Sequence, residues 1–325
     1  MKEIKKIAVL TSGGDAPGMN AAIRAVVRAG IHYGLEVMGI KRGYDGLVHN
    51  DIFPMGKESV AQIIQRGGTI LKTVRSEEFR TDEGMEKAYQ NLQAHHIDAL
   101  AVIGGDGTFT GARIFGKKYN VPILGLPGTI DNDLAGTDYA IGYDTAINTV
   151  MEAVDKIRDT AESHDRLFVV EVMGRDSGLI ALRSGISIGA EAVLIPEIEV
   201  NYENIIESLS KKTRKNKSSR IVIVAEGDKD GGLVVGQKLK ESFPHFDIRV
   251  SILGHIQRGG SPSCMDRVLA SRLGVAAVEG LLQGRKAEMV GVIGGKIQYT
   301  PFEKSIKHIV KIDENLTNIV EILAY

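Results

Sequence analysis

Residues 99–108 read ALAVIGGDGT, an apolar run that ends in a glycine-rich turn. Residues 7–18, IAVLTSGGDAPG, have the same form: a short apolar run followed by paired glycines and an aspartate. Each turn leads into a pattern typical of a helix. A strand that passes through a tight turn into a helix is the repeating unit of parallel α/β proteins. These two stretches therefore predict an α/β fold.

Outward from these stretches, apolar runs alternate with amphipathic patterns along the chain. Met19, Ile23 and Val26 have helical spacing, and so does the stripe that includes Val150 and Val154. Several strands are apolar throughout, as expected for strands covered by helices on both faces. The predicted strands are residues 7–10, 36–40, 99–103, 122–126, 167–172, 192–195, 221–225, 248–253 and 289–293.

Composition places the chain among ordinary globular proteins. It has 325 residues, 43% of them hydrophobic and 25% charged, with a formal net charge of −1. This balance argues against a protein that coats nucleic acid or an anionic membrane. The single cysteine, Cys264, excludes an intrachain disulfide. No apolar run approaches the roughly 20 residues of a membrane span, and the start of the chain lacks a signal-peptide pattern. We expect a cytoplasmic protein, with two units of about 150 residues as the base expectation.

Ligands of open α/β sheets bind where the strands end. Gly13-Gly14 and residues 104–107 follow two predicted strands and precede helices, so backbone amides and a helix N-terminus can hold a phosphate. Neither turn matches a Walker A loop or a G-x-G-x-x-G fingerprint. Tight connection alone would explain one such turn, but two turns, each with a nearby aspartate, favour phosphate binding. Asp106 suits Mg²⁺, which takes one or two carboxylates and phosphate oxygens.

Asp131 and Asp133 follow the next strand, in the stretch PGTIDND. Three interpretations compete: a turn capped by its own side chains, a glycosidase-like pair, and a base beside a metal-site carboxylate. The turn is the commonest in general. A glycosidase has no use for two phosphate sites. Next to a nucleotide phosphate, one carboxylate could accept the proton of an attacking hydroxyl.

Cations near other strand ends could grip phosphate groups. The guanidinium forks of Arg166, Arg175, Arg249 and Arg258 suit bidentate contacts, and His255 lies among them. The remaining histidines lack metal-ligand spacing. The basic run 211–217, KKTRKNK, is the type of segment that is most often simply solvated.

At this point a family resemblance becomes apparent. The stretches LTSGGDAPGMNAAIR, IGGDGT, LPGTIDND, GTDYAIGYDTA, VVEVMGR and LGHIQRGGSP occur in the order typical of 6-phosphofructokinases. The sequence resembles the short bacterial ATP-dependent type over all but about the last 20 residues.

The resemblance implies transfer of the γ-phosphoryl of ATP to the 1-hydroxyl of fructose 6-phosphate with Mg²⁺, the committed step of glycolysis. It implies two Rossmann-like αβα domains with mainly parallel sheets. Residues 1–141 and 257–306 would form the ATP domain, in place of a sequential division. Residues 142–256 and 307–325 would form the sugar-phosphate domain. A homotetramer with shared active sites, regulated by ADP or phosphoenolpyruvate, is also implied.

The same resemblance implies roles for individual residues. Asp131 would be the general base with Thr129 and Asp133 beside it, and Arg175 would stabilise the transferring phosphoryl group. ATP would be held by Gly14, Arg75, Ser76, Gly105, Asp106, Gly107 and Thr108, with Asp106 on Mg²⁺. The sugar phosphate would contact Thr129, Ile130, Asp131, Met173, Gly174, Arg175, Glu226, His255, Ile256, Gln257 and Arg258, with Arg166 and Arg249 reaching it from a neighbouring subunit. The effector would contact Arg24, Arg28, Lys57, Arg158, Gly189, Ala190, Glu191, Lys215 and Lys217.

Three other functions compete with an ATP-dependent phosphofructokinase. Pyrophosphate-dependent relatives typically carry Asp at the position of Gly107 and Lys at that of Gly128, so two glycines favour ATP. Intact Asp106, Asp131 and Arg175 argue against an inactive metabolite sensor. The sequence lacks the G-x-G-x-x-G fingerprint of a dinucleotide-dependent oxidoreductase. One departure is Lys57 where the family often has Arg, and another is Ser218-Ser219 in place of a longer basic cluster, so effector affinity or selectivity is an open point.

Overall fold

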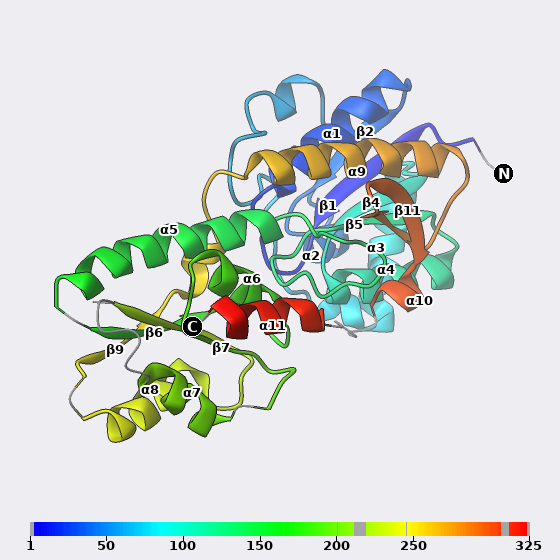
Figure 1. The fold of residues 1–325 in the computed structure, drawn as a ribbon. Helices are drawn as coiled ribbons and strands as arrows, with labels where there is room; N and C mark the ends of the chain where they lie inside the picture. The colour runs from blue at the N-terminus through cyan, green and yellow to red at the C-terminus, as the bar shows by residue number, and fades with distance from the viewer. Residues whose placement is uncertain are drawn as a thin grey trace. The chain divides into compact units, whose positions relative to one another are not determined.

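The structure, a computed structural model, describes residues 3–164, 166–199, 201–210, 219–244, 246–306 and 312–323 (Figure 1). The chain divides into two compact units, each built from two segments. The first unit comprises Met1–Thr145 and Arg258–Ile309. The second comprises Ala146–Gln257 and Val310–Tyr325. Each unit therefore needs two stretches that are distant in the sequence.

The first unit is built on a seven-stranded sheet of order β11-β10-β5-β4-β1-β2-β3. The five strands from β10 to β2 in that order are mutually parallel, and the two edge strands run antiparallel to their neighbours. The strands are β1 (Lys6–Thr11), β2 (Glu36–Ile40), β3 (Ile52–Pro54), β4 (Ala99–Gly104), β5 (Ile123–Pro127), β10 (Glu288–Ile293) and β11 (Lys296–Pro301).

Helices cover both faces of this sheet, which explains why its central strands are apolar throughout. Helices α1 (Met19–His32) and α9 (Cys264–Leu282) pack against each other on one face (Figure 1). The opposite face packs against the phenylalanine-rich helix α4 and its neighbours. The helices of that face are α2 (Tyr44–Val48), α3 (Asp82–Ala94), α4 (Asp106–Tyr119) and α10 (Phe302–Ser305).

The second unit has a four-stranded, wholly parallel sheet of order β7-β8-β6-β9. Leu167, Val169 and Val222 lie in its core and are fully buried. The strands are β6 (Leu167–Val172), β7 (Ala192–Leu194), β8 (Arg220–Ala225) and β9 (Ile248–Ile252). The helices are α5 (Tyr143–Glu162), which begins in the last residues of the first unit, α6 (Leu179–Ser187), α7 (Tyr202–Ser210), α8 (Gly231–Ser242) and α11 (Glu314–Leu323).

The structure confirms the predicted α/β class, with each predicted strand found within a few residues of its expected bounds. Both predicted helical stripes are also present, in α1 and α5. The two edge strands of the seven-stranded sheet, β3 and β11, were not predicted from the sequence. Strand β3 has only three residues, and β11 is half exposed with a polar sequence, KIQYTP. Strand β11 follows β10 through Gly294-Gly295, both with positive φ, so a tight glycine turn was its only sequence signal.

A buried aspartate joins the beginnings of α5 and α9. Asp266 in the first turn of α9 is 1% exposed and accepts hydrogen bonds from the amides of Gly142 and Thr145 at 2.9 and 2.8 Å. The Thr145 hydroxyl donates to it at 2.5 Å. In return, Ser263 caps α9 by accepting from the Asp266 amide and donates to Asp144 of α5. Each helix start thus satisfies backbone groups of the other.

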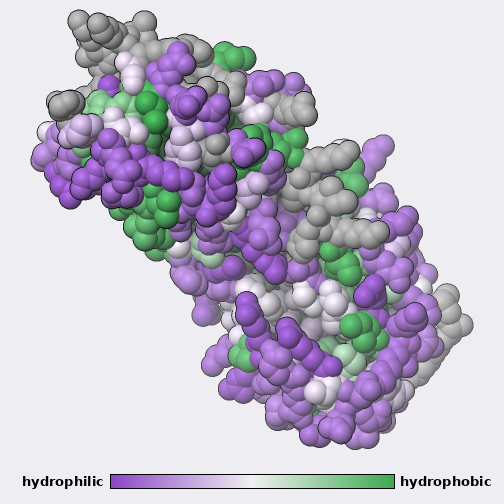
Figure 2. Space-filling view, turned by 90° about the horizontal axis from the view of Figure 1, so that it is seen from below, coloured by the Kyte–Doolittle hydropathy of each residue, from purple (hydrophilic) through white to green (hydrophobic). Residues whose placement is uncertain are grey.

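The surface of the described residues is predominantly polar on the face drawn in Figure 2, where hydrophobic side chains form small separate groups. Within the described ranges, no helix has both the length and the apolar composition to cross a membrane.

Candidate active site

The ends of three neighbouring strands, β1, β4 and β5, bring the predicted phosphate loops together in the first unit. The Ser12 amide donates to the Ile103 carbonyl at 3.0 Å, joining the loops after β1 and β4. The Gly128 amide donates to the Gly104 carbonyl at 3.0 Å, joining the loops after β4 and β5. The sequence motifs therefore form one continuous edge, as the rule for parallel sheets requires.

The first glycine turn combines a left-handed backbone with a cation. Gly13 has φ +87°, which a side chain would strain, and its carbonyl accepts from the Thr73 hydroxyl at 2.6 Å. A Cβ on Gly14 would meet the Arg258 guanidinium at 2.4 Å. That guanidinium donates to the Asp15 carbonyl at 3.2 Å. Arg258, which the resemblance places on the sugar phosphate, thus lies directly against the first turn.

The second turn forms the N-terminus of α4. Asp106 is the first helical residue, and Gly105 precedes it in extended conformation. The Thr108 hydroxyl donates to the Ser12 carbonyl at 3.0 Å, so α4 is fastened to the first turn. A Cβ on Gly107 would have no atom within 4 Å. The N-terminus of α4 therefore presents backbone amides and open space, which suit a phosphate, beside a carboxylate, which suits a hard cation.

The loop after β5 holds its carboxylates in a largely buried position. Thr129, Asp131 and Asp133 are 8%, 6% and 7% exposed. The Thr129 hydroxyl accepts from the Asp131 amide at 3.2 Å. Asn132 has φ +53°, donates to the Asp138 carbonyl and accepts from the Ala140 amide at 2.6 Å. The middle residue of the pattern thus turns the loop while its neighbours supply buried carboxylates.

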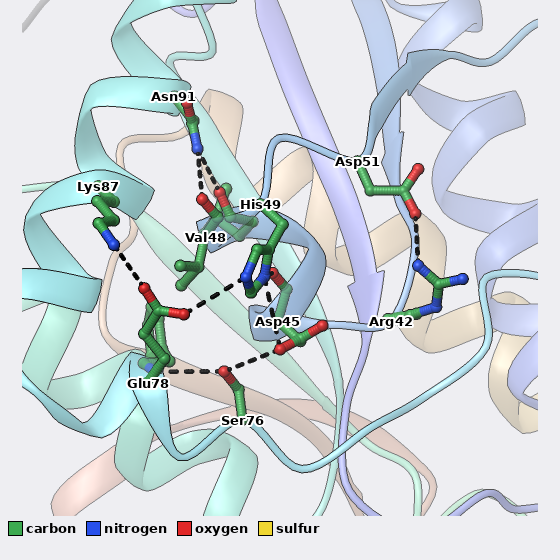
Figure 3. A network of polar contacts seen from close by, with 11 residues as sticks. Arg42, Asp45, Val48, His49, Asp51, Ser76, Glu78, Lys87 and Asn91 are labelled. Atoms are coloured by element: carbon green, nitrogen blue, oxygen red, sulfur yellow. Dashed lines mark hydrogen bonds and ion pairs between the residues drawn. The ribbon is translucent and has the colours of Figure 1, made fainter.

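A polar network supports the segment that carries Arg75 and Ser76 (Figure 3). The Ser76 hydroxyl donates to Asp45 at 3.4 Å and accepts from the Phe79 amide at 3.3 Å. His49 lies between Asp45 and Glu78, with its ring nitrogens 3.6 and 3.4 Å from their carboxylates (Figure 3). The Lys87 ammonium donates to Glu78 at 2.7 Å and holds the pKa of that carboxyl below its ordinary value.

In the second unit, the loop after β6 carries the predicted phosphoryl-stabilising arginine. Gly174 has φ +154° and Arg175 has φ +56°, a left-handed conformation rare for a residue with a side chain. Glu226, one residue beyond β8, accepts from the amides of both. Beyond β9, the 3₁₀ turn Gly254–Arg258 exposes His255 and Ile256 but buries Gln257, which accepts from the Met173 amide at 2.8 Å.

Arg166 and Arg249 lie at the opposite end of that sheet. Arg166 directly precedes β6, and Arg249 is the second residue of β9. Asp247 holds both, accepting from Arg166 Nε at 2.7 Å and lying 2.9 Å from Arg249 Nε. These two contacts, that with Arg166 above all, lower the pKa of Asp247. Asp247 was not among the predicted site residues. The feature that could have indicated it is an acidic residue two positions before the predicted Arg249.

The residues expected at an effector site are distributed between the two units. On α1, Arg24 and Arg28 lie one turn apart, and burial together with the Arg28 charge lowers the pKa of Arg24. Lys57 is exposed before a short 3₁₀ turn of the first unit. In the second unit, Arg158 donates to the Ile188 carbonyl at 2.6 Å, next to Gly189 and the buried Ala190. Glu191 is buried and accepts from the Ile221 amide. Lys215 and Lys217 lie outside the described residues.

The carboxylates at the sheet edge determine whether the site fits Mg²⁺. Among the described residues, no three His, Cys, Asp or Glu side chains group closely enough to hold a metal ion by themselves. Asp106 offers one carboxylate at a helix N-terminus. This arrangement fits a hard cation that obtains most of its oxygens from water and from the phosphates of a bound nucleotide.

The fold is that of an α/β protein whose glycine turns and carboxylates meet at one sheet edge. The chain matches the family described as Phosphofructokinase over residues 6–281, and it belongs to that family. It is 54% identical to ATP-dependent 6-phosphofructokinase 2 of Bacteroides thetaiotaomicron, covering 100% of both chains. It is 55% identical to ATP-dependent 6-phosphofructokinase of Cytophaga hutchinsonii, covering 98% of this chain and 97% of the relative. Among solved structures, phosphofructokinase from Saccharomyces cerevisiae has a TM-score of 0.89 and 39% identity over 98% of this chain, which spans 48% of the yeast chain.

Proposed function

We propose that this protein transfers the γ-phosphoryl group of ATP to the 1-hydroxyl of fructose 6-phosphate, giving fructose 1,6-bisphosphate and ADP. The observation that carries the proposal is the meeting of two glycine turns and two carboxylates, Asp106 and Asp131, along one sheet edge. Its family relatives named ATP-dependent 6-phosphofructokinases match along essentially the whole chain. A glycolytic role and a cytoplasmic location follow from that reaction.

The first unit would hold the nucleotide. Amides of the two glycine turns and the N-terminal end of α4 face the same edge, where they can receive the phosphates. Arg75 and Ser76 would contact the nucleotide from the segment fastened to Gly13 by Thr73. Asp106 would hold Mg²⁺, which when bound neutralises negative charge on the phosphates.

Asp131 would act as the general base. Its carboxylate is buried on a loop fixed by Thr129 and Asn132, so it can accept the proton of the sugar hydroxyl without large movement. Arg175 would stabilise charge on the transferring phosphoryl group. Asp133, Ile130 and the loop Met173–Arg175 complete the set of proposed contacts.

The space at Gly107 supports ATP as the phosphoryl donor. Its Cβ position is open, so a side chain there would project into the space that the phosphates use. At Gly128, a Cβ would lie 3.0 Å from Ile103 and 3.1 Å from Met19, so a larger residue needs a repacked loop. Gly107 therefore leaves room that a pyrophosphate-specific site would fill, whereas Gly128 lies in a closely packed position.

Arg166 and Arg249 support a site shared between subunits. Within the second unit they lie at the starting ends of β6 and β9, whereas Glu226 and Arg175 follow the far ends of β8 and β6. Strand β6 alone separates these ends by about 17 Å. A single sugar phosphate is too small to contact both ends of one sheet. We therefore assign the two arginines to the substrate of a neighbouring copy in a homotetramer.

The effector proposal rests on cations that lie away from the strand ends in each unit. Arg24 and Arg28 form one pair, and Arg158 lies beside the turn at Gly189. Such cations suit the phosphates of ADP or phosphoenolpyruvate.

A phosphoryl-transfer assay tests the reaction. Fructose 6-phosphate would be offered with ATP and with pyrophosphate in parallel, and tagatose 6-phosphate would replace it in a third arm. We expect fructose 1,6-bisphosphate with ATP and Mg²⁺ only. Turnover with pyrophosphate in place of ATP would contradict the proposal.

Hybrid tetramers test the shared site. Arg166→Ala and Asp131→Ser chains, each nearly inactive alone, would be unfolded together and refolded. Some hybrid sites would then combine an intact Asp131 with an intact Arg166 from the neighbour, so activity should return. Verified hybrids without activity would show that Arg166 acts within its own chain.

A further inference from the structure

The first three amides after β6 donate to side chains rather than to backbone carbonyls. Three successive amides donate to side-chain oxygens: Met173 to Gln257 Oε1 at 2.8 Å, Gly174 to Glu226 Oε1 at 3.2 Å and Arg175 to Glu226 Oε1 at 2.7 Å. The two acceptors come from different parts of the second unit, the turn after β8 and the turn after β9.

The loop needs such support because its backbone is strained. Arg175 has φ +56°, a left-handed conformation that is unfavourable for a residue with a side chain. A Cβ on Gly174 would lie 2.4 Å from the Ser177 carbonyl, so the loop is also tightly folded on itself. Two acceptors that together take three amides fix the direction in which the Arg175 side chain leaves the backbone.

Both acceptors are themselves fixed. The Glu226 amide donates to the Val172 carbonyl at 2.8 Å, at the very end of β6. A Cβ on the next residue, Gly227, would lie 2.1 Å from the Arg175 carbonyl, so glycine is required for Glu226 to come this close. Gln257 is fully buried, and its Nε2 has no hydrogen-bond partner among the residues that the structure describes. A buried amide nitrogen without a partner is unfavourable, so its presence indicates that the Gln257 oxygen is needed as the acceptor for the Met173 amide.

We propose that Glu226 and Gln257 form an acceptor clamp that positions Arg175 for phosphoryl transfer. The proposal rests on the proposed function, and it gives Glu226 a role beyond contact with the sugar. Both are positioning residues: they act on the reaction through the backbone of Arg175. Loss of the clamp would let the arginine leave its productive direction, and a misplacement of about 1 Å can cost about 10²-fold in rate.

Two pairs of variants test the clamp in the full-length protein. Glu226→Leu and Gln257→Met remove an acceptor while keeping approximate size. Glu226→Gln keeps an amide oxygen and should rescue most of the effect. Glu171→Leu is the matched control, because Glu171 also accepts from a backbone amide in this unit, that of Gly232 at 2.6 Å, and the same substitution removes that acceptor outside the loop.

Steady-state kinetics and amide exchange supply the readouts. We expect Glu226→Leu and Gln257→Met to lower kcat about 10- to 100-fold with the KM for ATP unchanged. Without any substrate, peptides covering 173–175 should exchange amide hydrogens at least about 10-fold faster, and peptides from β8 and α8 should not change. The control Glu171→Leu should leave kcat and that exchange at wild-type values.

The outcomes distinguish a failure of the clamp from a failure of the proposed kinase function. A rise in the KM for fructose 6-phosphate alone, with kcat and exchange unchanged, would make Glu226 a sugar ligand only and overturn the clamp. Unchanged exchange in Gln257→Met would overturn it as well. Should the wild-type protein lack kinase activity, the proposed function fails, while the exchange experiment still decides whether the clamp exists.

Discussion

Removal of the Asp266 carboxylate should destabilise the first unit severely. In Asp266→Ala, the amides of Gly142 and Thr145 lose their acceptor in a buried place. Each buried donor left unsatisfied costs about 1–3 kcal/mol, so we expect a loss of about 3–5 kcal/mol. The Thr145 hydroxyl also loses its acceptor, but it can rotate its proton and keeps the hydrogen bond that it accepts from the Ser263 amide at 2.9 Å. Ser263→Ala, which removes the cap of α9 and the hydrogen bond to Asp144 but keeps the Asp266 carboxylate, should cost less, about 1–2 kcal/mol.

The pH dependence of stability gives an independent check. Burial, the dominant cause, raises the pKa of Asp266 above its ordinary value of 3.8 despite the hydrogen bonds it accepts. Between that value and the raised one, the folded state binds more protons than the unfolded state at this group. Its contribution to stability therefore falls as the pH rises through this window and is constant above it. Asp266→Asn, which cannot ionise, lacks this contribution.

Urea unfolding at several pH values measures both effects. The chain has no tryptophan, so tyrosine fluorescence and far-ultraviolet circular dichroism are the probes. The free energy of the wild type minus that of Asp266→Asn should decrease with rising pH just above pH 4. A loss below about 1 kcal/mol in Asp266→Ala would refute the assignment of Asp266 as the acceptor that joins the two helix starts. An increase with pH would instead show that the hydrogen bonds to the carboxylate outweigh its burial, and it would contradict the raised pKa.

Three further variants test the proposed site. Asp131→Ser should lower kcat at least about 10²-fold with little change in either KM, and near-normal turnover in a kinetic assay would remove Asp131 as the base. Gly107→Asp should fold normally, because its Cβ position is open, yet raise the KM for ATP by repulsion between carboxylate and phosphate; unaltered ATP kinetics would end that account. Arg28→Ala should blunt the response to ADP or phosphoenolpyruvate and spare kcat, with the exposed Lys117→Ala as control. Lost kcat in Arg28→Ala would argue against a separate effector site.

Most of the fold could be predicted from the local spacing of apolar residues. Central strands are apolar throughout and α5 has a clear stripe, so both could be found without the structure. The meeting of the glycine turns also followed from the strand-end rule. Strand β11 could not be predicted because its sequence is polar. As an edge strand it pairs with β10 alone, so it needs no continuous apolar run.

Contacts between distant residues could not be predicted in the same way. Asp247 is 81 residues from Arg166, and Asp266 is 121 residues from Thr145. An aspartate in a turn or in the first turn of a helix is common, and its ordinary role is a local cap. Only the folded chain shows which carboxylate serves a remote partner. The clamp on Arg175 is of the same kind, since 52 residues separate Gly174 from Glu226.

The construction of each unit from two chain segments has a consequence for synthesis on the ribosome. Helix α1 packs so closely on α9 that a Cβ on Gly274 would lie 2.4 Å from Ala25. The partner of this face is made only after the 112 residues from Ala146 to Gln257. At typical elongation rates this interval lasts about 6 to 22 s. During that time the apolar side of the nascent first unit is without its cover, so the newly made chain should be a substrate for holding chaperones until α9 emerges.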